Sequence, residues 1–387
     1  MSKLRPALME LVDFVHRLYG EQGAVPLHSP VFWGNEKQYL CDCIDTTFVS
    51  SVGAYVDRFE AMICELTGAG YAIATVNGTA ALHVALRLAG VQPDDLVVTQ
   101  PLTFVATCNA ISYLGASPAF VDVDSQTLGM SAVALEAWLL EHAERRVQGT
   151  FHKSLNRRIA AVVPMHSFGL MCDIEALLRV CDSWQLQLVE DAAEALGSRS
   201  QGRHAGTFGQ LGAFSFNGNK IITCGGGGCI VTDDEVLARR AKHLTTTGKL
   251  PHAWHFYHDE VAFNYRMPNI NAALGCAQLE QLTSLLADKQ ATASAYQSFG
   301  MAHGLNFVPA RPGTESNYWL NTLLLDSLSE RDAFLHYANQ QGVQARPAWR
   351  LMNELPAFIT APSGPLPVAN DLAQRLVNLP SGVRGLD

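Results

Sequence analysis

The sequence predicts an α/β protein: a mostly parallel seven-stranded sheet with helices on both faces, followed by a smaller C-terminal α+β domain. Two observations support this prediction. Between residues 71 and 234, short apolar runs of strand length alternate with amphipathic stretches of helical length. Such alternation is typical of parallel strands joined by crossover helices. After about residue 245 the alternation ends, which indicates a second structural unit.

The elements of the first unit can be assigned in chain order. Its apolar runs have the length of buried strands, and the segments between them place apolar residues at helical intervals. The expected strands are residues 71–76, 96–100, 119–122, 159–166, 187–191, 213–216 and 229–232. The clearest helical patterns between them are residues 80–89, 132–142 and 173–182.

The C-terminal third differs in character. A loop rich in histidine and aromatic residues, 252–258, leads into Asn264-Tyr-Arg-Met-Pro268. The elements expected after it are a long helix over residues 270–299 and strands near residues 318–325 and 343–345. We therefore predict a large domain with its N-terminal segment over residues 1–250, and a second unit over residues 251–387.

The composition excludes several classes of protein. Hydrophobic residues make up 48% and charged residues 16% of the chain, as in globular proteins with a large core. The net charge of −9 argues against a nucleic-acid-binding surface, which needs a concentrated basic stripe. Residues 4–19 have helical spacing rather than the unbroken apolar stretch of a signal peptide, and no later segment is apolar enough to span a membrane. Nine cysteines without a CxxC pattern are typical of reduced thiols, so we expect a soluble cytoplasmic protein.

Lys220 and Asp191 form the most informative pair of residues in the sequence. Asp191 ends one apolar run, and Lys220 follows the next one, ahead of a run of four glycines. Ligands of parallel sheets gather at the carboxyl ends of the strands, so one cleft can receive both side chains. A lysine amine that can form an imine, with a carboxylate that keeps a pyridine nitrogen protonated, is what pyridoxal 5'-phosphate (PLP) chemistry requires. The pair therefore predicts a PLP site.

Each member of this pair also has a plainer interpretation. Lys220 alone would be a solvated loop lysine, but the nearby glycines let the backbone approach a planar cofactor. Asp191 alone would be a buried, capped carboxylate. Glu190 would point to the opposite side of the strand, so only one of these two acids can face a cofactor, and we assign Asp191.

A phosphate site is predicted where Asn77-Gly78-Thr79 joins a strand to a helix. Backbone N–H groups at a helix N-terminus bind anions, and Thr79 adds a hydroxyl. Ser215, five residues before Lys220, can donate to the same phosphate. The alternative is that this turn only caps the helix. The presence of Lys220 and Asp191 makes the phosphate site the better interpretation.

Three further features have two interpretations each. Phe104 either stacks on a pyridine ring or belongs to the core, and His166 is either a strand-end site residue or a structural histidine. His252, His255 and His258 have the spacing of one helical face, but Pro251 and the aromatic residues indicate a loop. No carboxylate or cysteine completes a metal site there, so we expect no metal.

The motifs together resemble the DegT-type nucleotide-sugar aminotransferases, which are PLP enzymes of fold type I. The resemblance covers nearly the whole chain and rests on the order and spacing of its motifs. These are Pro26-Leu-His-Ser-Pro30, Gly34-Asn-Glu-Lys37, Asn77-Gly-Thr-Ala80, Thr103-Phe-Val-Ala-Thr107, Glu190-Asp-Ala-Ala193, Ser215-Phe-Asn-Gly-Asn-Lys220 and Asn264-Tyr-Arg-Met-Pro268. Residues 43–53 and Ala345-Arg-Pro-Ala-Trp349 are similar to the branch that makes 4-amino-4,6-dideoxy-N-acetylhexosamine nucleotides for the legionaminic acid and bacillosamine pathways.

The resemblance implies a role for each matching residue. Lys220 would form the internal imine and shuttle protons, Asp191 would hold the pyridine nitrogen, and Glu194 would lie near the phenolic oxygen. Asn264 would reach the cofactor phosphate of a neighbouring subunit, which implies a homodimer with shared active sites. The segment after residue 250 would form contacts between the two subunits. Gly78, Thr79 and Ser215 would bind the phosphate, and Phe104 would stack on the ring. The candidates for contact with the sugar nucleotide are Phe48, Ser51, His166, Tyr318, Arg346 and Trp349.

Three positions depart from the family pattern. Glu194 stands where relatives often have His or Gln, and a second anion beside the phenolate should alter the pKa of the imine. Gly226 occupies a position where many members have Glu. Ala348 follows Pro347 where many relatives have a histidine that contacts the substrate, and this favours the N-acetylhexosamine branch.

The implied activity is a two-step transamination. L-Glutamate would convert PLP to pyridoxamine phosphate, and a nucleotide-linked 4-keto-6-deoxy sugar would then receive the amine at C4, for the biosynthesis of surface polysaccharides such as lipopolysaccharide O-antigen. Two alternatives are weighed against it. A PLP-dependent sugar dehydratase of this fold has histidine in place of the lysine, and a catalytically silent regulatory paralogue would not need Lys220, Asp191 and Ser215 intact. The choice between UDP and GDP, the C2 substituent and the stereochemistry of the amine stay open.

Overall fold

The computed structural model describes residues 4–20 and 23–384. Its centre is a seven-stranded sheet, in which the middle strands are parallel and the antiparallel strand β11 joins β1 to β10. The strand order is β1 (Tyr71–Thr75), β11 (Gly228–Thr232), β10 (Leu211–Ser215), β7 (Gln187–Asp191), β6 (Ile159–Val163), β2 (Leu96–Thr99) and β3 (Ser117–Phe120). The predicted α/β class with a mostly parallel seven-stranded sheet is confirmed.

Helices cover both faces of this sheet because its strands are apolar on both sides. One face packs on helices rich in alanine and leucine, and the other packs on the larger core of aromatic and branched residues. The first group is α4 (Gly78–Leu88), α5 (Val105–Tyr113) and α8 (Glu235–Thr245). The second is α3 (Ala54–Thr67), α6 (Ala132–His142), α7 (Ile174–Trp184) and α9 (Asn269–Leu279), with α2 (Glu36–Asp45) packed on the outside of α9.

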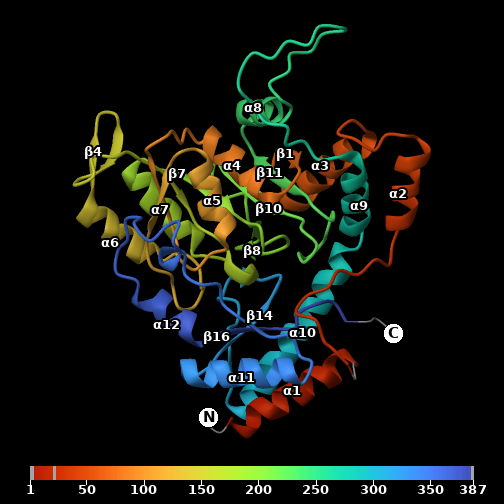
Figure 1. Ribbon diagram of the computed structural model, residues 1–387, viewed down its shortest axis with the longest axis vertical. Helices are drawn as coiled ribbons and strands as arrows, with labels where there is room; N and C mark the ends of the chain where they lie inside the picture. The colour runs from red at the N-terminus through yellow and green to blue at the C-terminus, as the bar shows by residue number, and fades with distance from the viewer. Residues whose placement is uncertain (1–3, 21–22, 385–387) are drawn as a thin grey trace.

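A smaller unit lies below the sheet in the view of Figure 1. It has its own hydrophobic core, which side chains from both ends of the chain form together. Its helices are α1 (Pro6–Tyr19), α10 (Leu282–His303), α11 (Leu328–Gln340) and α12 (Pro367–Arg375). Its sheet has the order β12 (Asn306–Phe307), β14 (Asn321–Leu324), β16 (Leu376–Leu379) and β15 (Arg346–Pro347).

The N-terminal helix belongs to this smaller core. Leu8, Leu11 and Val15 of α1 are fully buried with Tyr296 of α10 and Leu323 of β14. The boundary near residue 250 stays a prediction. It assigns α1 to the large domain, but the side chains of α1 are buried in the core of the smaller unit.

Short elements complete the described fold. They are the hairpin β4 (Ala143–Arg146) and β5 (Gly149–His152), the three-stranded sheet of β13 (Thr314–Glu315), β8 (Arg199–Ser200) and β9 (Arg203–His204), and 3-10 turns at Ser167–Gly169 and Met352–Glu354. Between α8 and α9 the chain forms an extended arm, residues 246–264, which projects beyond the body of the molecule (Figure 1). Two strand-like bridges, Thr246 to Asn264 and Lys249 to His258, join its two sides.

Two element predictions for the second unit are corrected. The single helix expected over residues 270–299 is two helices, because the chain turns at Glu280 and Gln281, where no proline or glycine marks the break. The strand expected at residues 343–345 pairs at Arg346–Pro347 instead, since Val343 forms an isolated bridge with Val25.

Candidate active site

A cavity of about 260 Å³ lies at the carboxyl ends of the central strands. Its walls come from the loops after β1, β2, β7 and β10 and from two tryptophans of the smaller unit, so both units contribute to it. The lining residues are Asn77, Gly78, Thr79, Leu82, Phe104, Ala106, Met165, Asp191, Ala193, Glu194, Ser215, Asn217, Asn219, Lys220, Trp319 and Trp349.

Lys220 reaches this cavity from the loop that joins β10 to β11. The Lys220 backbone N–H donates to the Asn217 carbonyl at 3.0 Å, which closes a tight turn directly before the lysine. The Lys220 side chain is only 14% exposed, and its Nζ lies 3.3 Å from Oε1 of Glu194. The amine is therefore held inside the cavity rather than solvated at its rim.

Asp191 ends β7 on the side of the cavity. The Thr107 hydroxyl donates to Oδ2 of Asp191 at 2.7 Å, and the Ala193 amide donates to Oδ1 at 3.1 Å. Burial raises the pKa of the Asp191 carboxyl, while these two hydrogen bonds and the nearby Lys220 lower it and favour the ionised form. The fixed carboxylate is suited to hold a protonated ring nitrogen.

Glu194 is a second buried carboxyl in the same cavity, but its surroundings differ. The Phe168 amide donates to Oε2 at 2.8 Å, and Oε1 faces Lys220. Burial raises the pKa of Glu194 to about 7, even though Lys220 and the Phe168 amide both lower it. Glu194 can therefore gain or lose a proton near neutral pH.

The first turn of α4 forms a cradle for an anion. The Asn77 side chain accepts the Ala80 amide at 2.8 Å and so caps the helix, while the Gly78 and Thr79 amides have no acceptor among the described residues. A Cβ on Gly78 would lie 2.7 Å from Cβ of Ser215. Only glycine at residue 78 lets this turn approach Ser215 so closely, and a phosphate would fit between them.

Aromatic side chains close the remaining sides of the cavity. Phe104 precedes α5 and is 49% exposed, although the three residues before it are buried. Its ring centroid lies 6.2 Å from that of Trp349, which itself stacks on Phe168 at 4.9 Å. An open aromatic face in a polar cavity is suited to stack on a planar ligand.

The comparisons with known proteins agree with this geometry. The model of the DegT/DnrJ/EryC1/StrS aminotransferase family matches residues 33–384. The chain belongs to this family. It is 35% identical over 360 residues to a GDP-perosamine synthase of Vibrio cholerae, covering 92% of this chain and 94% of the relative. It is 38% identical over 364 residues to EpsN of Bacillus subtilis, a putative pyridoxal phosphate-dependent aminotransferase, covering 92% and 90%.

A solved aminotransferase structure has the same fold. The aminotransferase TlmJ of Streptoalloteichus hindustanus superposes with a TM-score of 0.83 at 28% identity, over 93% of this chain and 94% of that one. The predictions of a DegT-type enzyme of fold type I, of aminotransferase activity and of PLP as cofactor are confirmed.

The residues of the cavity fit the cofactor of this family. Gly78, Thr79 and Ser215 offer amides and hydroxyls for its phosphate, and Phe104 offers a face for its ring. Asp191 and Lys220 lie in the same cavity, as the chemistry of the ring nitrogen and of the aldehyde requires. The individual roles of these residues stay predictions, but the structure brings all of them together with Glu194 and Trp349.

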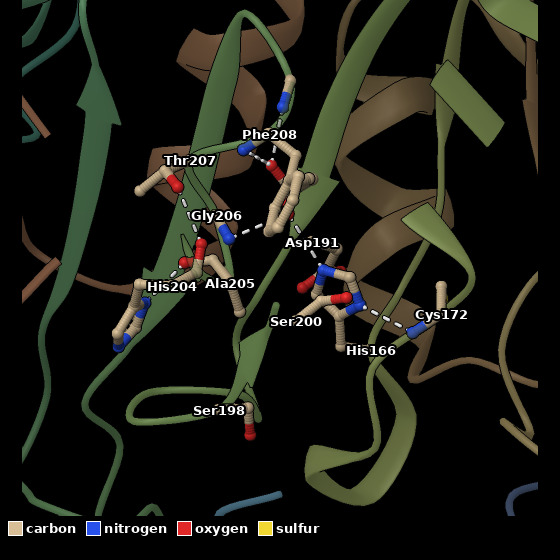
Figure 2. A network of polar contacts seen from close by, with 12 residues as sticks. His166, Cys172, Asp191, Ser198, Ser200, His204, Ala205, Gly206, Thr207 and Phe208 are labelled. Atoms are coloured by element: carbon tan, nitrogen blue, oxygen red, sulfur yellow. Dashed lines mark hydrogen bonds and ion pairs between the residues drawn. The ribbon is translucent and has the colours of Figure 1, made fainter. Parts of the chain in front are cut away.

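His166 lies behind the cavity wall. Its ring is fully buried, and Nδ1 accepts the Cys172 amide at 3.2 Å (Figure 2). Nε2 lies 3.0 Å from Oε2 of Glu190. Burial lowers the pKa of the His166 imidazole, but its contacts with Cys172 and Glu190 outweigh this and raise it to about 10. Both ring nitrogens contact protein groups, which supports the structural interpretation, and a substrate contact of His166 stays a prediction.

Tyr318 and Arg346 also lie outside the cavity lining. The Tyr318 side chain is buried, and its hydroxyl bonds Gln297 and the Ala310 amide, both at 3.2 Å. Arg346 donates to Asn339 and to the Ala345 carbonyl. Within one chain, neither side chain is placed to meet a ligand in the cavity.

Ser51 and Asn264 line a different hollow, a groove of about 940 Å³ at the base of the arm. Phe48 belongs to the same loop as Ser51 and is 55% exposed. The groove is basic, because Lys242, Lys249, His252 and Arg266 also line it. The structure therefore separates these three predicted residues from Lys220 within one chain.

The histidines of residues 252–258 lie on the exposed arm. Nδ1 of His252 accepts the amides of Trp254 and His255, so this ring serves the loop itself. In the described part of the chain, the residues with metal-ligand geometry are instead His243, Asp259 and Glu260. Arg240 pairs with both oxygens of Glu260, and His243 pairs with Asp259, so protein contacts already engage this partly exposed group.

Trp319, Asn217 and Asn219 also line the cavity, although none of them is among the predicted site residues. Asn217 and Asn219 lie within the quoted motif that ends at Lys220, so their position was available as a signal. Trp319 is about a hundred residues downstream in an apolar run, where nothing in the pattern separates a site residue from a core residue. The described helices include none that is long and apolar enough to span a membrane.

Proposed function

We propose that this protein transfers the amino group of L-glutamate to C4 of a nucleotide-linked 4-keto-6-deoxy sugar. The observation that carries this proposal is the pairing of Lys220 with Asp191 in one buried cavity of a nucleotide-sugar aminotransferase fold. An intact lysine at residue 220 argues against the sugar dehydratases of this fold, which have histidine there. The same lysine, with the open anion cradle, argues against a silent regulatory paralogue.

The protein's part in the reaction is to orient groups and to move protons. When bound, PLP supplies the electron sink and the carbonyl that accepts and releases the amine. Asp191, fixed by Thr107 and Ala193, keeps the ring nitrogen protonated. Nζ of Lys220 takes the α-proton of the donor and later returns a proton to C4 of the sugar. Glu194, beside that Nζ, holds or releases a proton as the charge around it changes.

The sugar is proposed to be an N-acetylated 4-keto-6-deoxyhexose. Support comes from the segment of residues 43–53 and from Ala345-Arg-Pro-Ala-Trp349, which resemble the branch that aminates such sugars. Trp349 of that segment lines the cavity, where its ring can pack on the apolar face of a sugar. A GDP-linked sugar without the acetamido group is the second candidate, because relatives at 34% and 35% identity are named GDP-perosamine synthases.

A homodimer with shared active sites is proposed for two reasons. Among the described residues that line the cavity, Lys220 is the one basic side chain, yet the cofactor phosphate and the nucleotide diphosphate bring several negative charges. The basic groove with Asn264 and Arg266 can neutralise them if it meets the cavity of a second copy. The arm also exposes Trp254, Phe256 and Val261 by 75%, 80% and 84%, and a partner subunit would cover these side chains.

The biological setting follows from the same findings. All nine cysteines are free, as expected for a reducing compartment, so we infer a cytoplasmic location. One relative, SpsC of Bacillus subtilis, is named a spore coat polysaccharide biosynthesis protein. We infer that the amino sugar made here also enters a surface polysaccharide.

The visible spectrum of the purified holoenzyme tests the proposal. L-Glutamate should bleach the band of the lysine-bound cofactor, and a UDP-linked 4-keto-6-deoxy-N-acetylhexosamine should restore it. Lys220→Ala should abolish both changes. Restoration by a GDP-linked 4-keto-6-deoxyhexose alone would replace the N-acetylhexosamine assignment with the second candidate. A band that L-glutamate leaves unchanged would overturn the donor assignment.

A further inference from the structure

Trp319 connects the smaller unit to the loop that carries Lys220. It lies just before β14, and its side chain is nearly buried in the cavity wall. Its indole N–H donates to the Asn219 carbonyl at 2.6 Å, directly next to Lys220 in the chain. The face of its ring lies 4.0 Å from Nζ of Lys220. One side chain thus contacts both the loop and the amine of the proposed catalytic lysine.

The backbone of Trp319 is itself firmly held. Its N–H donates to the Asn317 side chain at 2.8 Å, and its carbonyl accepts the buried ammonium of Lys289 at 3.2 Å. The Asn317 amide group in turn donates to the Glu194 carbonyl at 2.8 Å. Trp319 and Glu194, the two residues that contact the lysine amine, are therefore fixed to each other. Such a connection defines one position for the amine between them.

We propose that Trp319 is a positioning residue that holds Lys220 during the part of the reaction in which its amine is not joined to the cofactor. A lysine side chain is flexible, and a free amine would otherwise sample several rotamers. The ring face attracts the amine most strongly when it is charged, which is the state after it has taken a proton. The indole N–H keeps the loop from moving away. This inference rests on the proposed function, in which Nζ of Lys220 moves the proton.

Two substitutions separate the ring face from the rest of the side chain. Trp319→Phe keeps an aromatic face for the amine but loses the bond to the Asn219 carbonyl, whereas Trp319→Leu loses both. Trp138→Leu is the matched control, because Trp138 is also nearly buried but lines a different hollow. Trp319→Met fills more of the space and replaces the leucine variant if the latter does not fold.

The first measurement uses apoprotein and needs no turnover. PLP is added, and the rate at which the visible band of the lysine-bound cofactor appears is followed. We expect Trp319→Leu to slow this capture about tenfold and Trp319→Phe to stay within about threefold of the unaltered protein, because leucine no longer holds the amine where it can attack the aldehyde, whereas the phenyl ring still does. Trp138→Leu should lower thermal stability without changing the capture rate.

The second measurement is the half-reaction of the holoenzyme with L-glutamate. Because Trp319 acts on the lysine and not on the donor, the rate constant at saturating L-glutamate should fall about tenfold in Trp319→Leu, while KM stays within about twofold. Unchanged rates in Trp319→Leu, or Trp319→Phe as slow as Trp319→Leu, would overturn the role of the ring face. If Lys220→Ala keeps the half-reaction, the proposed function itself fails, whatever the Trp319 variants do.

Discussion

At the scale of single residues, two buried carboxyls divide the work around one lysine. Asp191 accepts hydrogen bonds from the Thr107 hydroxyl and the Ala193 amide, and both stabilise its charge. Glu194 accepts one from the Phe168 amide, and its other oxygen faces the Lys220 amine. Burial raises the pKa of both carboxyls, but at Asp191 its two hydrogen bonds and Lys220 oppose the shift. The pKa of Glu194 rises to about 7, so this carboxyl can exchange a proton near neutral pH.

Glu194→Gln should change how the stability of the apoprotein depends on pH. The pKa of Glu194 is raised from 4.5 to about 7 in the folded protein, so the folded state binds this proton more tightly than the unfolded chain does. The resulting stabilisation is complete below about pH 4.5 and is lost as the pH rises through about 7, a loss of about 3 kcal/mol. Glutamine cannot ionise, so the variant should lose less stability over this range.

Urea unfolding of both apoproteins at pH 5 and at pH 8 checks this expectation. The free energy of unfolding of Glu194→Gln should decrease less between the two pH values than that of the unaltered protein. Glu136→Gln is the control, because Glu136 is exposed and its replacement should leave the difference unchanged. An identical decrease in the Glu194 variant would show that Glu194 is ionised at both pH values.

Gly78→Ala should weaken cofactor binding. The added methyl group would lie 2.7 Å from Cβ and 3.1 Å from Oγ of Ser215, so the anion cradle must widen. We expect the affinity for PLP to fall roughly tenfold or more, because the amides of this turn and the Ser215 hydroxyl can no longer meet at one phosphate.

Gly218→Ala provides the matched control for this measurement. Gly218 lies in the loop that carries Lys220, but a Cβ there would meet nothing within 4 Å. Titration of apoprotein with PLP, followed by absorbance, should therefore separate the two alanine variants. Equal affinities would rule out Gly78 as part of the phosphate cradle.

At the scale of elements, the strands were predictable and several helices were not. All seven strands of the central sheet lie where the sequence predicts them, because strands buried on both faces are continuous apolar runs bounded by polar turns. The helices α2, α8 and α11 escaped prediction because they are polar and depend on tertiary contacts. The break between α9 and α10 has no local signal, since Glu280 there is held by Arg58, Tyr39 and Asn35 from distant segments.

The end of β7 shows how one strand serves two purposes. Alternation along the strand sends Asp191 into the cavity and Glu190 to the other side, as the sequence predicts. The Glu190 carboxylate accepts the amides of Gly206, Phe208 and Gly209 at 2.6 to 2.8 Å, and it also contacts the His166 ring. Glu190 thereby fixes the turn before β10 against β7.

Glu190→Gln should destabilise the whole domain. Its amide group would present hydrogens to backbone amides that are themselves donors, so buried groups lose their partners. We expect the free energy of unfolding to fall by about 3 kcal/mol or more, as when one partner of a buried charged network is removed. Thermal or urea unfolding measures the loss, and Glu136→Gln again serves as the exposed control. A loss below about 1 kcal/mol would mean that the network relaxes without harm.

At the scale of the whole molecule, the active site depends on parts that the sequence does not place. Motif order brings Lys220, Asp191, Ser215 and the Gly78 turn to one sheet edge, because strand ends of a parallel sheet share an edge. No such rule places Trp319 and Trp349, which reach the cavity through packing of the smaller unit on the sheet. Nor does the pattern show that the basic groove with Asn264 lies apart from the cavity in each chain.

That separation leads to an expectation about mixed assemblies. If a cavity is completed by the groove of a second copy, each active site takes Lys220 from one chain and Asn264 with Arg266 from the other. A Lys220→Ala chain and an Asn264→Ala/Arg266→Ala chain should each form inactive or weakly active dimers. A dimer that contains one chain of each variant would have one intact site. In that site the unaltered Lys220 of one chain meets the unaltered Asn264 and Arg266 of the other.

Co-expression of the two variants with different affinity tags tests this arrangement. With random pairing, about a quarter of the activity of the unaltered protein should return, since about half of the dimers are mixed and each carries one intact site of two. Lys220→Ala mixed with Asp191→Asn is the control, because both residues line the same cavity and no mixed dimer would be intact. If the first mixture is no more active than the control, Asn264 and Arg266 do not complete the cavity of a second chain. If the Asn264→Ala/Arg266→Ala chain is fully active on its own, each cavity is complete without the groove.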